Sequence, residues 1–406
     1  MEQKAEVLTK SPAGIPYWVK VVIVFFLGWF FIYADRVILN PVLGQIEAEF
    51  ALDKSQIGFL TSVFFFAYAL AQIPSGLLGE RYGRKLVLVL GFVFFGLCTG
   101  ATGLVTGYGM FLLLQFLTGI GQGTYYGPQY ALSSEVIPLK YRSLGSAMIN
   151  SGGAFGIGLG YIASSYVSLV WDFSWRTLFL LFAVPTVLVG LMIWWTVRDG
   201  RRIPQEKGSV EAQESIPLLT LFRNRNMLII FAVLFCSLYG FFMILTWLPY
   251  YLQDERGLQG SEVGYVSSLV AWASIPGALM FSKLSDKLGR RKPLAAVMLP
   301  CAAVSICAIV FIQDYTLLIA ALLLYGLTGK MALDPVLIAF VADNVPKAAY
   351  SKAFSVYNFI GMCSSIVAPY VTGFIAERTG SMASGFYLAA ILLVLAMGLI
   401  FFARER

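Results

Sequence analysis

Runs of about twenty apolar residues recur along the whole chain, and each is long enough to cross a lipid bilayer as a helix. Val19 to Asn40 and Phe386 to Phe402 are two of these runs. The chain is 58% hydrophobic and 13% charged, whereas an average soluble protein carries about 25% charged residues. A soluble core could not bury so much apolar surface. We therefore expect lipid to be the solvent for most of this protein.

Hydropathy and turn residues together predict twelve transmembrane helices. The predicted fold class is an all-α membrane protein built from two six-helix, pseudo-symmetric bundles. The predicted segments lie near residues 19–40, 56–78, 86–106, 109–133, 144–168, 176–197, 227–252, 262–282, 293–312, 316–341, 353–375 and 384–402.

The first segment and the cysteines argue against processing and against a metal or redox site. The first apolar run has full spanning length and no small-residue cleavage site, so we expect it to stay uncleaved. All five cysteines fall inside apolar segments without the paired spacing of metal or redox motifs. We interpret them as small packing residues. The sequence predicts no cofactor and no metal.

The basic residues indicate which helix ends face the cytoplasm. If both termini are cytoplasmic, 23 of the 29 Lys and Arg residues lie on the cytoplasmic side, as the positive-inside rule requires. The net charge of +7 then follows from topology, and we expect no nucleic acid partner. We expect a multi-pass protein of the cytoplasmic (inner) membrane. The other bases are Lys54, Arg176, Arg256 and Arg378 outside, with Arg36 and Lys330 inside segments.

One long polar stretch, residues 198–226, divides the predicted segments six and six. A repeat supports this division, because Ser55 and Gly58 align with Ser261 and Gly264 at a spacing of 206. Such parallel repeats are typical of transporters that alternate access to one site between two rocking bodies. We predict a monomer with a cytoplasmic tail (1–18), a first bundle (19–197), a linker (198–226), a second bundle (227–402) and a tail (403–406).

Two basic loops stand at matching places in the repeat, GLLGERYGRK at 76–85 and SKLSDKLGRRK at 282–292. Each has an acid near a helix end, able to bridge to a neighbouring helix, with bases at the lipid surface. A plain basic loop that obeys topology would explain one copy but hardly two in register. We predict that the loops gate conformational change through Glu80, Arg81, Gly83, Arg84, Asp286, Gly289 and Arg290.

The two loops resemble the signature loop of the major facilitator superfamily. Further stretches resemble its anion:cation symporter family, which includes hexuronate, aldonate and aromatic-acid carriers and sialin. The resemblance covers nearly the whole chain and implies the major facilitator fold and transport of a small organic anion. These stretches are Tyr33-Ala-Asp-Arg36, Tyr68 with Pro74-Ser-Gly76, Trp175-Arg176, Trp247-Leu-Pro-Tyr-Tyr-Leu252, and Asn358 with Gly361.

Arg36 lies well inside the first segment, where an ionised side chain costs at least ~2.5 kcal/mol and normally faces a cavity or a partner. Tyr33, Arg36 and Asn40 share one helical face. Asp35 is rotated off that face, yet it is close enough to neutralise Arg36. A guanidinium presented in this way suits a planar carboxylate. In the alternative interpretation the pair only braces helices, or Arg36 snorkels outward.

The fourth segment carries a polar stripe whose amides and phenols can bind polyhydroxylated or aromatic anions, or can serve only as interhelical glue. Proton-coupled relatives have Arg and Glu seven residues apart in this segment, at positions that match Gln115 and Gln122. Loss of that glutamate weakens a direct transfer of their coupling scheme to this chain. The stripe consists of Gln115, Thr118, Gln122, Tyr126 and Gln129.

Lys330 and Asp334 lie one helical turn apart in the tenth segment, deep in an apolar run. Lys330 could be a second anion-binding charge that protonation of Asp334 releases. An internal salt bridge that only stabilises the bundle is the equal alternative. Pro335 directly after the pair suggests a kink, which favours a nearby cavity.

The chain has no histidine, so any proton carrier inside the membrane must be a carboxylate. Asp35 and Asp334 are the only acids well inside predicted segments. Either one could exchange a proton when substrate takes over its neighbouring cation.

These patterns predict a secondary transporter that moves a small organic anion, such as a sugar acid or an aromatic acid, by alternating access and proton symport. Its partners would be the anion, protons and the lipid bilayer. We expect substrate near the midplane between the halves, bound by Tyr33, Arg36, Tyr68, Gln122, Tyr126, Asn150, Trp247, Lys330 and Asn358.

Two rival interpretations remain open. Drug or metabolite efflux by proton antiport through the same fold would use an apolar cavity, for which Phe64 to Phe66 and Trp272 are available. An intramembrane enzyme or receptor would need a nucleophile or nucleotide-binding motif, and none stands out. We therefore do not expect an enzyme.

Overall fold

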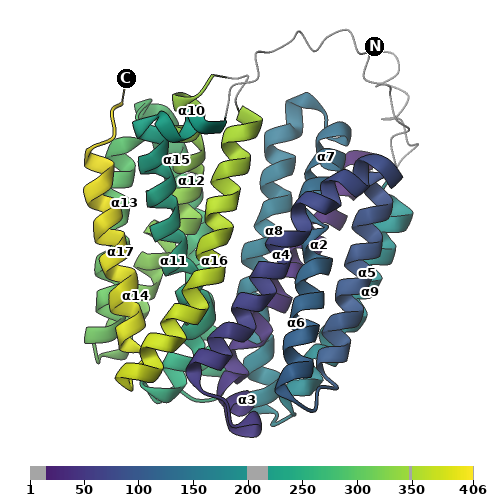
Figure 1. The fold of residues 1–406 in the computed structure, drawn as a ribbon, viewed down its shortest axis with the longest axis vertical. Helices are drawn as coiled ribbons and strands as arrows, with labels where there is room; N and C mark the ends of the chain where they lie inside the picture. The colour runs from purple at the N-terminus through teal and green to yellow at the C-terminus, as the bar shows by residue number, and fades with distance from the viewer. Residues whose placement is uncertain (1–14, 199–217, 347–349, 406) are drawn as a thin grey trace. The chain divides into compact units, whose positions relative to one another are not determined.

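The computed structural model describes residues 15–198, 218–346 and 350–405, and every regular element among them is helical (Figure 1). Residues 1–14 and 199–217, most of the predicted N-terminal tail and linker, lie outside the described residues. The α-helices are α2 (Tyr17–Ile38), α3 (Leu43–Phe50), α4 (Lys54–Tyr82), α5 (Arg84–Thr102), α6 (Tyr108–Gly123), α7 (Tyr126–Val136), α8 (Arg142–Ser165), α9 (Trp175–Thr196), α10 (Leu218–Arg223), α11 (Arg225–Asp254), α12 (Ser261–Leu288), α13 (Lys292–Phe311), α14 (Tyr315–Thr328), α15 (Lys330–Asn344), α16 (Tyr350–Thr379) and α17 (Ala383–Phe401).

The all-helical prediction is confirmed, and in the described ranges 11 helical stretches are long and apolar enough to cross a membrane. A short 3-10 turn at Asn40–Val42 interrupts the first stretch, a second at Leu139–Tyr141 joins α7 to α8, and a π-helical turn, η3, at Tyr166–Val170 follows α8. The predicted segment 109–133 is divided into α6 and α7. Each of these two helices is too short to span a membrane alone, so this predicted segment is not among the eleven helical stretches.

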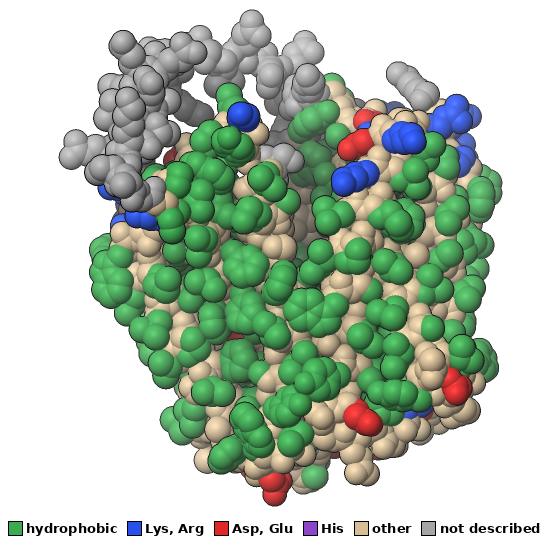
Figure 2. Space-filling view, turned by 180° about the vertical axis from the view of Figure 1, so that it is seen from behind, with side chains coloured by type: hydrophobic (Ala, Val, Ile, Leu, Met, Phe, Trp, Pro, Cys, Tyr) green, Lys and Arg blue, Asp and Glu red, His purple; other side chains and the backbone are tan. Residues whose placement is uncertain are grey.

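The outer surface of the helices is apolar, as contact with lipid requires. Ile73 on α4 and Trp195 on α9 are each 74% exposed. On the face in Figure 2, hydrophobic side chains cover most of the surface, and charged side chains gather near the helix ends. In water these residues would be a large unburied patch, whereas in a bilayer they meet acyl chains.

The described chain forms two compact units. The first unit contains residues 15–39, 63–160 and 171–198, and the second contains 40–62, 161–170, 218–346 and 350–405. The second unit thus takes two short pieces from the first six predicted segments: the turn after α2 with the start of α4, and the end of α8 with η3. These pieces pack against α11 and α12.

Glycines let α8 approach α2 closely inside the first unit. A β-carbon at Gly152 would lie 2.3 Å from the Phe26 carbonyl oxygen, and one at Gly156 would lie 2.2 Å from that of Phe30. No side chain fits there. Small residues spaced by four permit this packing, which substitutes for a hydrophobic driving force in lipid.

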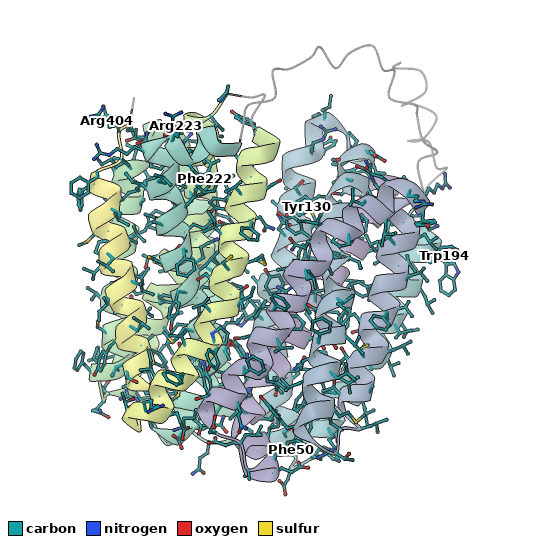
Figure 3. All side chains as sticks on the ribbon, viewed as in Figure 1. Phe50, Tyr130, Trp194, Phe222, Arg223 and Arg404 are labelled. Carbon is teal, nitrogen blue, oxygen red and sulfur yellow. The ribbon has the colours of Figure 1, made fainter. Side chains whose placement is uncertain are left out.

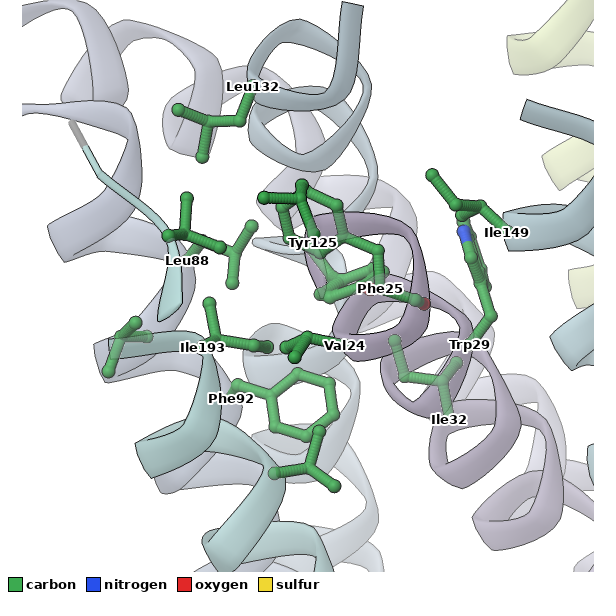
Figure 4. Packing of buried hydrophobic residues seen from close by; sticks show 14 of the residues in the cluster. Val24, Phe25, Trp29, Ile32, Leu88, Phe92, Tyr125, Leu132, Ile149 and Ile193 are labelled. Carbon is green, nitrogen blue, oxygen red and sulfur yellow. The ribbon is translucent and has the colours of Figure 1, made fainter. Parts of the chain in front are cut away.

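Figure 4 shows the aromatic core of the first unit, in which Tyr125 joins α2, α5 and α7. Its ring lies 5.3 Å from Trp29 and 5.4 Å from Phe92, measured between ring centroids. Its hydroxyl donates a 2.9 Å hydrogen bond to the Phe25 carbonyl. This core holds the part of α2 that precedes the residues of the candidate site.

In the second unit, α11 lies beside α16 and α17 (Figure 1), and it contains a proline at position 249. Pro249 has no N–H, so the Leu245 carbonyl one turn earlier loses its helical donor. Two side chains replace that donor: Asn40 donates from Nδ2 at 2.7 Å, and the Tyr161 hydroxyl donates to the same oxygen. A buried carbonyl that would be costly alone is therefore satisfied twice.

We predict that these two donors are partly redundant. Asn40→Leu or Tyr161→Phe should each lower the free energy of unfolding by about 0.5–1.5 kcal/mol, the net value of one hydrogen bond. The double variant should lose more than the sum, because only then is the Leu245 carbonyl orphaned. Thermal unfolding in detergent, followed by tryptophan fluorescence, measures all three variants.

Pro249→Ala provides the matched control because it restores the missing N–H. Added to the double variant, it should recover stability, since the helix then satisfies Leu245 itself. Strict additivity of the two losses together with no recovery by Pro249→Ala would contradict this account of the contact.

Candidate functional site

Arg36, near the end of α2, lies among aromatic rings of the first unit. Its guanidinium carbon is 4.9 Å from the Tyr33 ring centroid and 4.6 Å from that of Tyr68. Phe64 and Phe65 on α4 lie at 5.6 and 5.5 Å. The face of an aromatic ring attracts a cation but carries no net charge, so these rings hold the guanidinium without neutralising it.

A chain of hydrogen bonds joins Arg36 to Asp35 through the amide of Gln122. Arg36 Nε donates to Gln122 Oε1 at 2.9 Å, and Gln122 Nε2 donates to Asp35 Oδ2 at 2.8 Å. Thr99 on α5 donates to the other carboxylate oxygen, Oδ1, at 2.8 Å. Gln122 is fully buried, and Asp35 is only 9% exposed. The two charges are therefore connected by a neutral side chain from α6.

The guanidinium of Arg36 has donors that this chain of hydrogen bonds does not use. Arg36 Nη2 is buried and has no hydrogen-bond partner among the residues that the structure describes. A buried unsatisfied donor is uncommon and costly, and such groups in native proteins call for an explanation. A carboxylate oxygen is the acceptor that best matches the planar, charged guanidinium of an arginine.

Tyr126 and Asn150, also predicted for the site, lie in the first unit but in a neighbouring cluster. Tyr126 packs 4.9 Å from Tyr130 and 6.1 Å from Trp29, centroid to centroid. Tyr130 of α7 (Figure 3) donates from its hydroxyl to Asn150 Oδ1 at 2.8 Å. Trp29 packs 5.7 Å from Tyr33, which links this cluster to the rings around Arg36.

The second unit brings together Lys330, Asp334 and Tyr357. Lys330 Nζ lies 2.5 Å from Asp334 Oδ1, and the Tyr357 hydroxyl donates to that same oxygen at 2.7 Å. Lys330 is 8% exposed, whereas the Asp334 side chain is 36% exposed. Asn358 follows Tyr357 on α16 and is half-buried. The lysine is thus paired within its own helix, unlike Arg36.

Trp247 is fully buried on α11 and donates from Nε1 to the Pro369 carbonyl at 3.1 Å. Asn40 shares a helical face with Arg36 by sequence, but its amide is engaged by Leu245. The contacts of both residues join packed helices of the second unit.

The helix breaks in the two halves occur at related places. The spacing of 208 that relates Asn150 to Asn358 also relates Gln122 to Lys330. Gln122 is the penultimate residue of α6, and Lys330 opens α15 directly after the break at Gly329. Discontinuous helices of this kind carry binding residues in many transporters.

The two signature loops turn on glycines in backbone conformations that other residues avoid, with φ of 103° at Gly83 and 62° at Gly289. Near the first loop, Arg84 pairs with Glu135 of α7 at 2.5 Å. Near the second, Arg291 pairs with Asp343 of α15 at 3.1 Å and with Asp286 at 3.3 Å. Each ion pair tightens one unit at a helix end.

Of the other loop residues, Glu80 and Arg81 lie in the last turn of α4, and Arg290 is exposed. The pairing base of the second loop is Arg291, one residue beyond the predicted position.

Several residues that complete these clusters were missed by sequence reasoning. Glu135 and Asp343 are 208 residues apart, so the repeat could have revealed them. Thr99 and Tyr357 gave no such signal. A lone hydroxyl in an apolar helix has no distinctive spacing, and only the packing of the helices assigns it a partner.

Comparisons with known proteins agree with this architecture. The family model described as Major Facilitator Superfamily matches residues 25–260 and 230–406. Among solved structures, the D-xylose-proton symporter aligns with a TM-score of 0.80 at 16% identity, over 96% of this chain and 98% of that one. A bacterial homologue of the human lysosomal transporter Spinster aligns at 0.79 and 18%, over 96% and 97%.

Curated relatives are similar over nearly their full length. The probable galactarate/D-glucarate transporter of Bacillus subtilis (strain 168) is 27% identical, covering 93% of this chain and 90% of the relative. The hexuronate transporter of the same organism and the cis,cis-muconate transport protein of Acinetobacter baylyi are each 26% identical, covering 93% and 92%. The superfamily indicated by the two loops is confirmed: this chain belongs to the Major Facilitator Superfamily.

Proposed function

We propose that this protein is a secondary transporter of a small carboxylate, a sugar acid or an aromatic acid, and that Arg36 binds the substrate carboxylate. The observation that carries this proposal is the buried Nη2 of Arg36, which has no hydrogen-bond partner among the described residues. The neighbouring Nε of the same guanidinium already donates to Gln122. The tyrosines over the guanidinium add hydroxyls and ring faces that suit polyhydroxylated or unsaturated acids.

The relatives support the same substrate class. Galactarate, D-glucarate, hexuronates and cis,cis-muconate, the compounds in their names, are all carboxylates. The relatives are named as transporters, and we propose that this chain likewise moves its substrate without catalysis. A cavity for apolar drugs would have little use for an arginine inside the membrane, which favours transport of an anion over efflux of apolar compounds.

We predict that Arg36→Gln loses carboxylate binding while the protein stays folded. Removing a charged, hydrogen-bonded partner costs about 2–5 kcal/mol, or roughly 30-fold or more in affinity. Arg36→Lys should recover only part of this, because an ammonium lacks the planar fork. Binding of galactarate, glucuronate and cis,cis-muconate in detergent measures the effect.

Arg378→Gln is the matched control, since it removes an exposed arginine at the far end of α16. Thermal unfolding of each variant confirms that it folds. Equal affinity of wild type and Arg36→Gln for an acid that the wild type binds would exclude Arg36 as the ligand.

We further propose a monomer in the cytoplasmic membrane with both termini in the cytoplasm. The distribution of Lys and Arg supports this orientation. It places the two signature loops, which carry most of the clustered bases, at the cytoplasmic surface, where anionic lipid attracts them.

The signature loops are proposed to govern the balance between inward-facing and outward-facing states. Their ion pairs, Arg84 with Glu135 and Arg291 with Asp286 and Asp343, support a role in holding helix ends. Charges outside the membrane core bias such an equilibrium without touching the substrate.

We predict that Asp286→Asn shifts the distance distribution between spin labels on the cytoplasmic ends of α4 and α12, with at most a small change in substrate affinity. Glu262→Gln, which neutralises an exposed acid in the first turn of the same helix, is the control. Identical distributions in Asp286→Asn and wild type would rule out the gating role.

Proton symport requires a carboxylate, and we propose Asp35 as the carrier, with Asp334 as the competing candidate. Asp35 is tied to Arg36 through Gln122. Asp334 is tied directly to Lys330. Neutralising either acid would free its cation for an anion, so proton and substrate would bind with positive cooperativity.

We predict that Asp35→Asn retains substrate exchange across proteoliposome membranes but no longer accumulates substrate in response to a pH gradient. Asp334→Asn, the matched variant, should keep gradient-driven accumulation if Asp35 is the carrier. The opposite result would transfer the role to Asp334. Accumulation by both variants would remove the proton from this scheme.

A further inference from the structure

We propose that Gln122 is a positioning residue that transmits the protonation state of Asp35 to Arg36 by turning its side-chain amide. This inference rests on the proposed function of Asp35 and Arg36 and gives it a mechanism. It assigns Gln122 a role other than direct contact with substrate.

The present orientation of the amide is forced by its neighbours. An ionised carboxylate only accepts hydrogen bonds, and a guanidinium only donates them. Gln122 must therefore direct Nε2 to Asp35 and Oε1 to Arg36, as it does at 2.8 and 2.9 Å. Because the side chain is fully buried, water does not offer a substitute partner.

A proton on Asp35 Oδ2 turns this oxygen from a hydrogen-bond acceptor into a donor. The new O–H bond would face the Nε2 donor of Gln122, and two donors repel. Rotation of the amide by half a turn about its terminal torsion, which is two-fold and soft, brings Oε1 to the new donor. The same rotation brings Nε2 to Arg36, where it meets a second donor. The hydrogen bond between Gln122 and Arg36 then breaks.

The consequence concerns one edge of the guanidinium. Nε–H and one N–H of Nη2 are parallel donors along a single edge, which can bind both oxygens of a carboxylate. In the structure Gln122 occupies Nε, and Nη2 has no partner among the described residues. Turning the amide would free Nε and complete the two-donor edge. Proton binding would in this way prepare Arg36 for the substrate.

The surroundings leave few other routes. The titratable groups beside Asp35 are Arg36 and the Cys98 thiol of α5. Several other ionisable side chains of the described residues near α2 have contacts of their own: Tyr68 lies over Arg36, Tyr125 donates to Phe25, Tyr130 donates to Asn150, Tyr161 donates to Leu245, Glu135 pairs with Arg84, Arg176 donates to Val105, and Tyr126 packs on Tyr130.

Among the described residues, Thr99 offers a competing path for the proton of Asp35. Its hydroxyl could turn from donor to acceptor if the proton sat on Oδ1, and the amide of Gln122 would then stay where it is. Thr99→Val removes the hydroxyl that could accept from Oδ1 and leaves the contact of Oδ2 with Gln122. This variant therefore distinguishes a proton on Oδ1 from a proton on Oδ2.

The test follows the wild-type protein in lipid nanodiscs through a pH series. Arginine is labelled with ¹⁵N, and the Nε resonance of Arg36 is assigned by its loss in Arg36→Lys. The infrared band of the Asp35 carboxyl is assigned with Asp35→Asn. We expect both signals to change together. A carboxyl band that titrates without any change at Arg36 Nε overturns the relay, and so does an Asp35 that does not titrate while the protein remains folded.

Gln122→Met keeps the length of the side chain and removes both hydrogen bonds. The Arg36 Nε resonance should then stay near its low-pH wild-type position at every pH. Thr99→Val should still show a pH-dependent change at Arg36 Nε, at a midpoint shifted by the lost hydrogen bond to Asp35. A wild-type pH response in Gln122→Met refutes the proposal. The wild-type series remains decisive if the methionine variant does not fold.

Affinity for D-glucarate gives the second measurement. In wild type it should rise by about 5- to 150-fold as Asp35 becomes protonated, the usual range of coupling between two sites. In Gln122→Met it should stay at the low-pH value. An intact resonance response without D-glucarate binding contradicts the proposed substrate and supports the relay. If D-glucarate binding depends on Arg36 but not on Gln122, the proposed substrate is supported and the relay is contradicted.

Discussion

The core of a bilayer offers no hydrogen-bond partners, so the backbone groups within it must be satisfied by the protein itself. This constraint explains why the regular elements of the described chain are helices. It also explains why the one carbonyl freed by Pro249 attracts two donors, Asn40 and Tyr161, from distant parts of the sequence. The same rule makes any group that remains unsatisfied informative.

Arg36 is such a group. The protein surrounds its charge with rings and gives Nε an acceptor, yet leaves Nη2 without one in the described structure. A purely structural arginine would gain by pairing directly with the neighbouring carboxylate, because an uncompensated buried charge is strongly destabilising. Here a neutral amide separates the two charges. Under the proposed function, this arrangement would keep the guanidinium available for a substrate carboxylate at the cost of some stability.

The two halves use one plan with different chemistry. Both break the helix that corresponds to the fourth segment of a half, and positions 122 and 330 are equivalent by the repeat. The first half has an amide there between a separate acid and base. The second half has the base itself, paired one turn away with Asp334. The two breaks differ in backbone conformation, since Thr124 after α6 is right-handed helical and Gly329 before α15 is extended.

Hydropathy, charge and the repeated loops were enough to predict the membrane class, the positions of nearly all helices and the superfamily, and they singled out Arg36 and Asp35 as candidates for the site. These features depend on hydrophobic length, charge distribution and the cost of burying an ionised group, and each of them is local along the chain. Only the tertiary structure decided that Gln122 bridges the two charges, that Thr99 and Tyr357 complete the clusters, and that α6 ends just after Gln122. Those outcomes depend on which helix faces lie against one another, and a hydrogen bond between residues 86 positions apart leaves no periodic signal in a single sequence.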